Sequence, residues 1–249
     1  MTLDLQEPTG ATPLTPDELL GLKAGHISTR SELNELEGEN IIEGLTWLDR
    51  RPGSFDVLTD DAAREVHKRL FGQVWNWAGI YRLTEKNIGV SVWHITTETR
   101  ICLDDARYWR GNATFDPLEA AARFHHKLVW VHPFANGNGR WARIMTDAYL
   151  ATLDPDIFLD WSGGGTLIAD SDHRARYIAA LRAADGYDLE PLIAFVRQSL
   201  ARGTRSSGKT APHAVEQMLD DHRSTITSDI VRTPSRRPSC TMTSMTERA

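Results

Sequence analysis

The stretch from His132 to Arg143 gathers side chains that can act together on an anionic substrate. Arg140 and Arg143 are three residues apart, so they lie on one face of a helix, and their guanidinium groups match phosphate oxygens in pairs. His132 has an ordinary pKa of about 6.5 and is mostly neutral at cellular pH. It can therefore accept a proton from an attacking hydroxyl group. The pattern predicts a polyphosphate site beside a general base.

The glycines of this stretch give the anion its backbone contacts. Gly137 and Gly139 flank Asn138 and leave the neighbouring N–H groups open to a ligand. A helix beginning at Gly137 or Asn138 would aim its free N–H groups back toward His132. The alternative is a structural turn with the arginines on the surface. A zinc site is not expected, because no second ligand has the right spacing to His132.

Helices must hold this stretch in place. Asp116-Pro117-Leu118-Glu119 predicts the start of one helix that runs to about Val131, and Pro133 ends it. His125 and His126 in this helix are expected to be structural. A second helix follows. The residues spaced to form its core face are Trp141, Ile144, Met145, Ala148 and Tyr149.

Most other segments also predict helices. Capping residues or apolar spacing predict one helix that starts at Thr15 and another that starts at Thr96. The other predicted helices cover Ser28–Asp49, Thr59–Phe71, 170–172 to Ala184, and Leu189 to Gly203. The exception is 84–95, whose alternation after an Asn/Gly turn predicts a β-hairpin. We expect an arm and short helix over 1–29, one domain over 30–203, and a disordered tail over 204–249.

Composition limits the functional class. The chain has 249 residues and a net charge of −6, so neither a general nucleic-acid surface nor a membrane-spanning segment is expected. Cys102 and Cys240 lie far apart and are interpreted as reduced thiols. The acidic N-terminus has no signal pattern. We therefore expect a cytoplasmic protein.

The central stretch resembles the Fic/Doc motif H-P-F-x-[D/E]-G-N-G/K-R-x-x-R. It matches at eight positions, which are His132, Pro133, Phe134, Gly137, Asn138, Gly139, Arg140 and Arg143. The resemblance covers about residues 30–200, and two further segments are similar to the Fic subgroup called mobile mystery protein B: 32–37 and 84–89.

This resemblance implies an all-α, Fic-type helical bundle with a small β-hairpin flap. It implies transfer of AMP from ATP to a Ser, Thr or Tyr hydroxyl of a target protein, as in toxin-like Fic proteins. His132 would be the catalytic base, Phe134 would anchor the loop, and the target would dock on the 84–95 hairpin. The nucleotide would be bound by a set of residues carried over by position: Gly137, Asn138, Gly139, Arg140 and Arg143.

Asn136 departs from the motif, which has an acidic residue there to help hold Mg²⁺. An amide oxygen can still coordinate Mg²⁺, but it carries no charge. The alternative function is therefore a nucleotide-binding regulatory module with weak or no transfer. A third possible function is transfer of phosphate or of another nucleotide group.

Many Fic proteins are restrained by a glutamate that pairs with the second arginine of the motif. Ser31 and Glu35 fit part of the restraining pattern, so we expect Glu35, or failing that Glu37, to pair with Arg143 as an inhibitory contact. The other glutamates of the acidic face are expected to be solvated. Restraint by a separate antitoxin-like protein is equally open.

Overall fold

The computed structural model describes residues 13–25, 27–51, 55–162 and 171–200, and this part of the chain is mostly helical. This confirms the predicted all-α fold class. The predicted tail over 204–249 and most of the predicted arm lie outside the described residues. None of the helices in the described ranges is long and apolar enough to cross a membrane.

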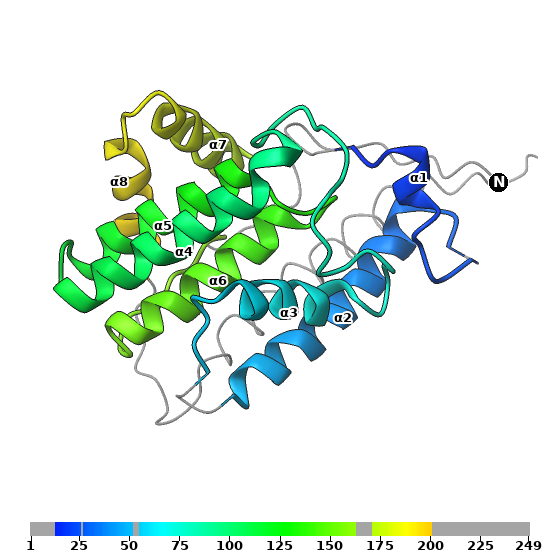
Figure 1. Ribbon diagram of the computed structural model, residues 1–249, viewed down its shortest axis with the longest axis horizontal. Coiled ribbons are helices and arrows are strands. Elements are labelled where there is room, and N and C mark those ends of the chain that lie inside the picture. Colours follow the sequence, from blue (N-terminus) through cyan, green and yellow to red (C-terminus); the bar gives the residue numbers. More distant parts are fainter. Residues whose placement is uncertain (1–12, 26, 52–54, 163–170, 201–249) are drawn as a thin grey trace, which may run out of the picture.

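Helices α5 (Pro117–Val131) and α6 (Asn138–Leu153) pack against each other at the centre of the molecule (Figure 1). The Asp116 side chain caps α5 by accepting from the N–H groups of Leu118 and Glu119, as the sequence predicted. The short turn that joins the two helices is the segment 132–137. The central stretch of the sequence therefore sits at the junction of the two innermost helices.

Two helices cover one side of this pair and a third packs on α5. Helix α2 (Arg30–Asp49) packs on α3 (Asp60–Phe71), α3 contacts α6, and α4 (Ile95–Asn112) contacts α5. Thr29 and Thr59 cap α2 and α3 through their hydroxyl groups, which fixes where these helices begin.

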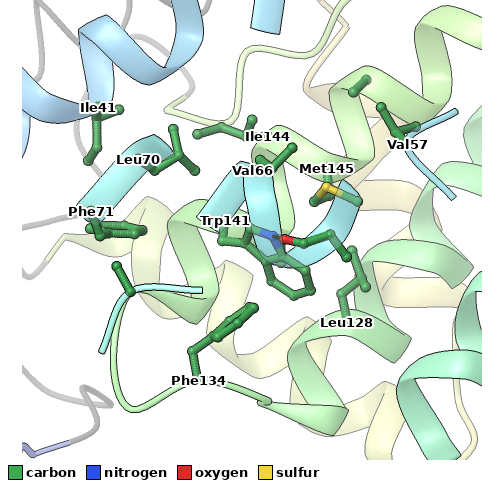
Figure 2. Close-up of a cluster of buried hydrophobic side chains, with 14 of the residues drawn as sticks. Ile41, Val57, Val66, Leu70, Phe71, Leu128, Phe134, Trp141, Ile144 and Met145 are labelled. Atoms are coloured by element: carbon green, nitrogen blue, oxygen red, sulfur yellow. Dashed lines mark hydrogen bonds between the residues drawn. The ribbon is translucent and has the colours of Figure 1, made fainter. Parts of the chain in front are cut away.

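Trp141 fills the middle of the main core (Figure 2). Its indole N–H donates to the Ala63 carbonyl at 3.0 Å, so the ring is buried without an unsatisfied polar atom. The same core cluster contains Ile41 of α2, Leu70 of α3, Leu128 of α5 and Met145 of α6. This packing fixes the start of α6, which carries Trp141, relative to α3.

A second cluster lies where α7 (Asp172–Asp185) and α8 (Glu190–Gln198) pack on α5. Helix α8 ends five residues before Gly203, the end predicted from the sequence. The short helix α1 (Pro16–Leu19) begins at the predicted cap Thr15 and lies on the opposite side of the molecule (Figure 1).

The β-hairpin predicted over 84–95 is wrong. This segment is an irregular loop that ends in a single 3₁₀ turn, η1 (Val92–His94), and it contains no strand. We call residues 82–94 the flap. Two flap carbonyls that a hairpin would use in its ladder, Thr84 O and Val90 O, instead accept from the Arg82 guanidinium. The inserted side chain therefore replaces cross-strand pairing.

Candidate active site

His132 lies at the turn after α5, in the left-handed conformation with φ 51°. Its N–H donates to the Leu128 carbonyl at 3.2 Å and closes the helix. A non-glycine residue with positive φ is uncommon and often marks a functional site. The residue is only 5% exposed. Its place as the C-cap of α5 confirms the prediction of a histidine at the end of this helix.

Burial, together with the positive charges of Arg82 and Lys86, lowers the pKa of His132 to about 4, against an opposing hydrogen bond with the Val129 backbone. At neutral pH the imidazole is therefore uncharged. This is the state that a general base requires.

The turn after His132 is held by two internal hydrogen bonds and a ring stack. The Asn138 amide accepts from Phe134 N–H at 2.9 Å and donates to Phe134 O at 2.8 Å. The Phe134 ring is fully buried, stacks on His67 at 3.7 Å between centroids and meets Trp141 edge-on. Phe134 thus anchors the loop as expected, while the Asn138 side chain is structural.

His67 on α3 also supports the loop, and the sequence reasoning did not identify it. Its Nδ1 accepts from Gly79 N–H at 3.0 Å, so Nε2 carries the proton and donates to the Asn136 carbonyl at 3.1 Å. Burial lowers its pKa to about 3. His67 lies four residues from both Ala63 and Phe71, and this position on the buried face of α3 was a signal for it.

Helix α6 begins directly after Gly137, as predicted. Gly137 has φ 77°, and a side chain there would lie 2.7 Å from the Phe71 ring. The first N–H groups of an α-helix have no partner within the helix. The backbone of Asn138, Gly139 and Arg140 therefore offers donors and the positive end of a helix dipole at the turn that follows His132.

Arg140 forms an ion pair with Glu37 of α2, with 2.7 Å between the guanidinium and the carboxylate. The other carboxylate oxygen of Glu37 accepts from the Trp75 indole N–H at 2.7 Å. Arg140 also lies over the Phe71 ring, 4.8 Å from its centroid. A glutamate from α2 therefore reaches the arginine-bearing helix, as the sequence analysis expected in outline.

The prediction named Glu35, or failing that Glu37, as the partner of Arg143. Glu35 is exposed, the second choice Glu37 forms the pair, and its partner is Arg140 instead of Arg143. The reason is the position on α2: Glu37 is four residues from the buried Leu33 and Ile41, so it shares their face. Glu35 points about 200° away from that face.

Arg143 turns in another direction, toward Tyr177 of α7. Burial raises the pKa of Tyr177, and the charge of Arg143 and a hydrogen bond from it oppose this rise. The Tyr177 hydroxyl also bonds His125 Nε2 at 2.9 Å, and His125 Nδ1 bonds Thr146 at 3.3 Å. His125 is therefore the core histidine that was expected, and it belongs to the network behind Arg143.

Asn136 occupies the position at which the Fic/Doc motif has an acidic residue that helps to hold Mg²⁺. Its side-chain oxygen is neutral and accepts from Gly137 N–H at 2.6 Å. The described ranges contain no group of three or more His, Cys, Asp or Glu residues with metal-site geometry. Mg²⁺ prefers charged oxygen ligands. The donor set at Asn136 therefore does not fit a tightly held resident metal ion.

Comparison with known sequences gives a family match to the same region. Residues 57–150 match the model of the Fic/DOC family, and this span runs from just before α3 through most of α6. Protein adenylyltransferase fic-1 of Caenorhabditis elegans is 32% identical over 149 residues, covering 57% of this chain and 27% of the relative. Protein adenylyltransferase Fic of Aedes aegypti is 27% identical over 151 residues, covering 59% of this chain and 28% of that protein. The chain spans little more than a quarter of these relatives' length.

Solved structures share the fold. A Fic-1 fragment from Caenorhabditis elegans superposes with a TM-score of 0.54 at 24% identity, covering 83% of this chain and 56% of that one. BepC from Bartonella tribocorum, determined with bound AMPPNP, gives a TM-score of 0.58 at 17% identity, covering 76% of this chain and 100% of that one. The helical arrangement around the His132 turn is therefore the fold of these proteins.

Proposed function

The chain belongs to the Fic/DOC family, and we propose that it is a protein adenylyltransferase that transfers AMP from ATP to a hydroxyl group of a target protein. The observation that carries the proposal is the neutral, buried imidazole of His132 at the turn that leads into the N-terminus of α6. The curated relatives, which bear the name of this activity, add support.

In the proposed reaction, the target hydroxyl oxygen attacks the α-phosphorus of ATP. The new O–P bond forms as the bond from the α-phosphorus to the bridging oxygen breaks, and pyrophosphate leaves. His132 takes the hydroxyl proton. The N–H groups of Asn138 and Gly139 would hold the phosphates, and Arg140 and Arg143 would neutralise them.

Mg²⁺ would enter this site with ATP as its counter-ion. A bound divalent ion neutralises charge that develops on the phosphates. The protein's own contribution lies in its fixed donors and cations, because Asn136 supplies only a neutral amide. The target protein would dock on the flap, whose Leu83 and Trp93 side chains are exposed.

We also propose that Glu37 restrains the reaction. Its pair with Arg140 occupies a guanidinium group that the nucleotide would use, and it is anchored by Trp75. An antitoxin-like partner and the cytoplasmic location stay predictions.

The experiment supplies the full-length protein with ATP labelled at the α-phosphate and follows label on protein, including self-labelling. We expect label in wild type and a loss of roughly 100-fold or more in His132→Ala. The control is ATP labelled at the γ-phosphate, which should leave no label. Undiminished labelling in His132→Ala would refute the mechanism, and label from the γ-position would indicate phosphate transfer.

The second candidate function, a nucleotide-binding module without transfer, is favoured by one observation, the neutral Asn136. It predicts ATP binding with no transferred label in wild type, and transfer in Asn136→Asp. Efficient transfer by the wild-type protein would exclude it.

A further inference from the structure

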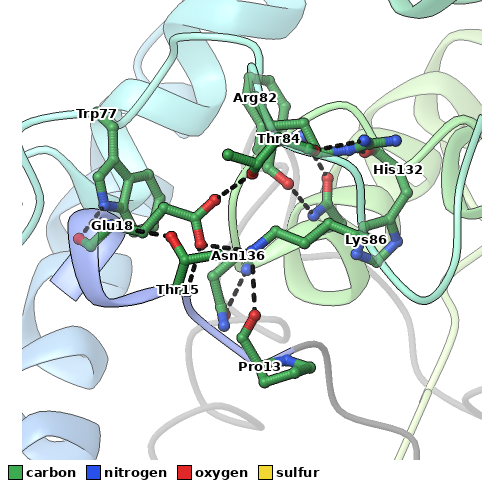
Figure 3. Close-up of polar contacts among 12 residues, drawn as sticks. Pro13, Thr15, Glu18, Trp77, Arg82, Thr84, Lys86, His132 and Asn136 are labelled. Carbon is green, nitrogen blue, oxygen red and sulfur yellow. Dashed lines mark hydrogen bonds and ion pairs between the residues drawn. The ribbon is translucent and has the colours of Figure 1, made fainter. Parts of the chain in front are cut away.

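Lys86 of the flap carries a positive charge that the proposed reaction has not yet used. Its side chain is only 3% exposed. The ammonium group contacts the Glu18 carboxylate and donates to the Pro13 carbonyl at 3.0 Å, both from the α1 region (Figure 3). A buried lysine is costly unless it is paired, so this arrangement fixes the position of the charge.

The flap places this charge beside the catalytic turn. The Arg82 guanidinium donates to the His132 carbonyl at 2.7 Å, and Arg82 N–H donates to Pro133 O at 2.9 Å. A side chain at Gly89 would lie 2.6 Å from His132 Cβ, so the flap backbone rests directly on the histidine. The positive charge of Lys86 helps to lower the pKa of His132.

Glu18 holds Lys86 as an ionised partner. Burial by itself would raise the pKa of Glu18, but hydrogen bonds from Lys86, Thr15 and Thr84 together lower it. Lys86 has three N–H donors, and within the described ranges Glu18 and Pro13 accept from them. A phosphate group that enters between the flap and the His132 turn would therefore compete with the Glu18 carboxylate for the ammonium group.

Charge accounting connects Lys86 with Asn136. A carboxylate with a bound divalent cation carries one net positive charge. An amide with an ammonium group carries the same net charge once the ammonium group has exchanged the Glu18 carboxylate for a phosphate. In this chain the amide is Asn136, and Figure 3 shows Lys86, His132 and Asn136 in one close-up. Asn136, which does not fit a resident metal ion, thus occurs together with the ammonium group of Lys86, which Glu18 and Pro13 hold in place.

We propose that Lys86 binds the phosphate groups of the nucleotide and supplies positive charge that the neutral Asn136 does not recruit through a metal ion. This inference rests on the proposed function, because it assumes that a nucleotide occupies the site. It predicts that ATP binding depends on Lys86 and depends only weakly on Mg²⁺. Glu18 then serves as the partner that positions the ammonium group in the free protein.

The test measures binding of ATP and of adenosine to the full-length protein by calorimetry, with Mg²⁺ and with a chelator. Lys86→Met should weaken ATP binding about tenfold, as loss of one charge-assisted hydrogen bond, and leave adenosine binding unchanged. Lys127→Met is the matched control, because Lys127 lies on α5 near Asp105. Glu18→Gln removes the α1 partner while keeping the ammonium group, and ATP binding should stay as tight or become tighter.

Three results would overturn the inference. They are an unchanged ATP affinity in Lys86→Met, an equal loss of adenosine affinity, or a loss in Glu18→Gln that matches the loss in Lys86→Met. Wild-type protein that binds no ATP would overturn the proposed function as well, so the two failures are distinguishable.

The metal dependence gives a second measurement. Chelation of Mg²⁺ should change the ATP dissociation constant of wild type by less than about threefold. In the double variant Asn136→Asp with Lys86→Met it should change by about tenfold or more, because a carboxylate then replaces the fixed cation. If chelation changes the ATP dissociation constants of the two proteins by the same factor, Lys86 does not take the place of a metal ion.

Discussion

Replacing Glu37 with glutamine removes one negative charge at a contact that links α2 to the candidate site. The carboxylate is 6% exposed, and its two oxygens accept from Arg140 and from Trp75, each at 2.7 Å. Glutamine has the same shape and can still accept from the Trp75 indole. Glu37→Gln therefore tests the charge of the pair with little change in packing.

The contact with Arg140 sets the expected size of the effect. A hydrogen bond to a charged group contributes about 1.5–3 kcal/mol. A nucleotide that uses the Arg140 guanidinium must give up this contribution, and about 1.4 kcal/mol corresponds to a tenfold change in affinity. Glu37→Gln should therefore bind ATP about 10- to 100-fold more tightly, with a matching rise in labelling at low ATP.

The same substitution should lower stability slightly. The arginine keeps its charge, but its side chain is 22% exposed, so water partly replaces the lost partner. We expect a loss of about 1–2 kcal/mol, less than for a fully buried pair. For a domain of this size that corresponds to a fall in Tm of about 2–8 °C.

Calorimetry with ATP measures the affinity, and Glu35→Gln is the matched control because Glu35 is exposed on the same helix. The control should leave ATP affinity unchanged. Folded Glu37→Gln protein with wild-type ATP affinity would refute the restraint by Glu37. A gain in Glu35→Gln instead would show that the restraining residue is the one first expected from the sequence.

The remaining predictions concern the base and the flap. Label transfer should stay constant from pH 8 to about pH 6 and fall only toward pH 4, because the lowered pKa keeps His132 neutral until then. A decline centred near pH 6.5 would contradict this burial effect. Gly89→Ala should lose about 1–3 kcal/mol of stability and reduce transfer, because residue 89 has φ 98° and touches His132. Thermal unfolding and labelling measure both changes, with Gly111→Ala as the control at an open position, and equal behaviour of the two variants would be evidence against flap packing on the base.

The sequence was sufficient for the local features of this protein. Thr15, Thr59 and Asp116 were recognised as helix caps, because a cap depends on hydrogen bonds to residues two or three positions away. The start of α6 after Gly137 and the position of His132 at the end of α5 follow from the same short-range rules. The order of His132, turn and helix N-terminus could therefore be predicted without coordinates.

Long-range contacts needed the tertiary structure. The pair of Glu37 and Arg140 joins residues 103 positions apart, and its identity depends on how α2 rotates as it packs on α3. The spacing of Glu37 from Leu33 pointed to the buried face, but it did not say which arginine would lie opposite. Side-chain direction across a helix interface is set by packing, which short-range patterns do not encode.

The flap shows the same division most clearly. Alternating residues over 84–95 favoured a hairpin, yet the Arg82 guanidinium takes two of the carbonyls that a hairpin would pair and binds the flap to His132. Lys86 likewise pairs with Glu18, which lies 68 positions away. The sequence by itself determined the helices and the position of His132. The tertiary structure decided which charges surround His132, because ion pairs form between elements that only folding brings together.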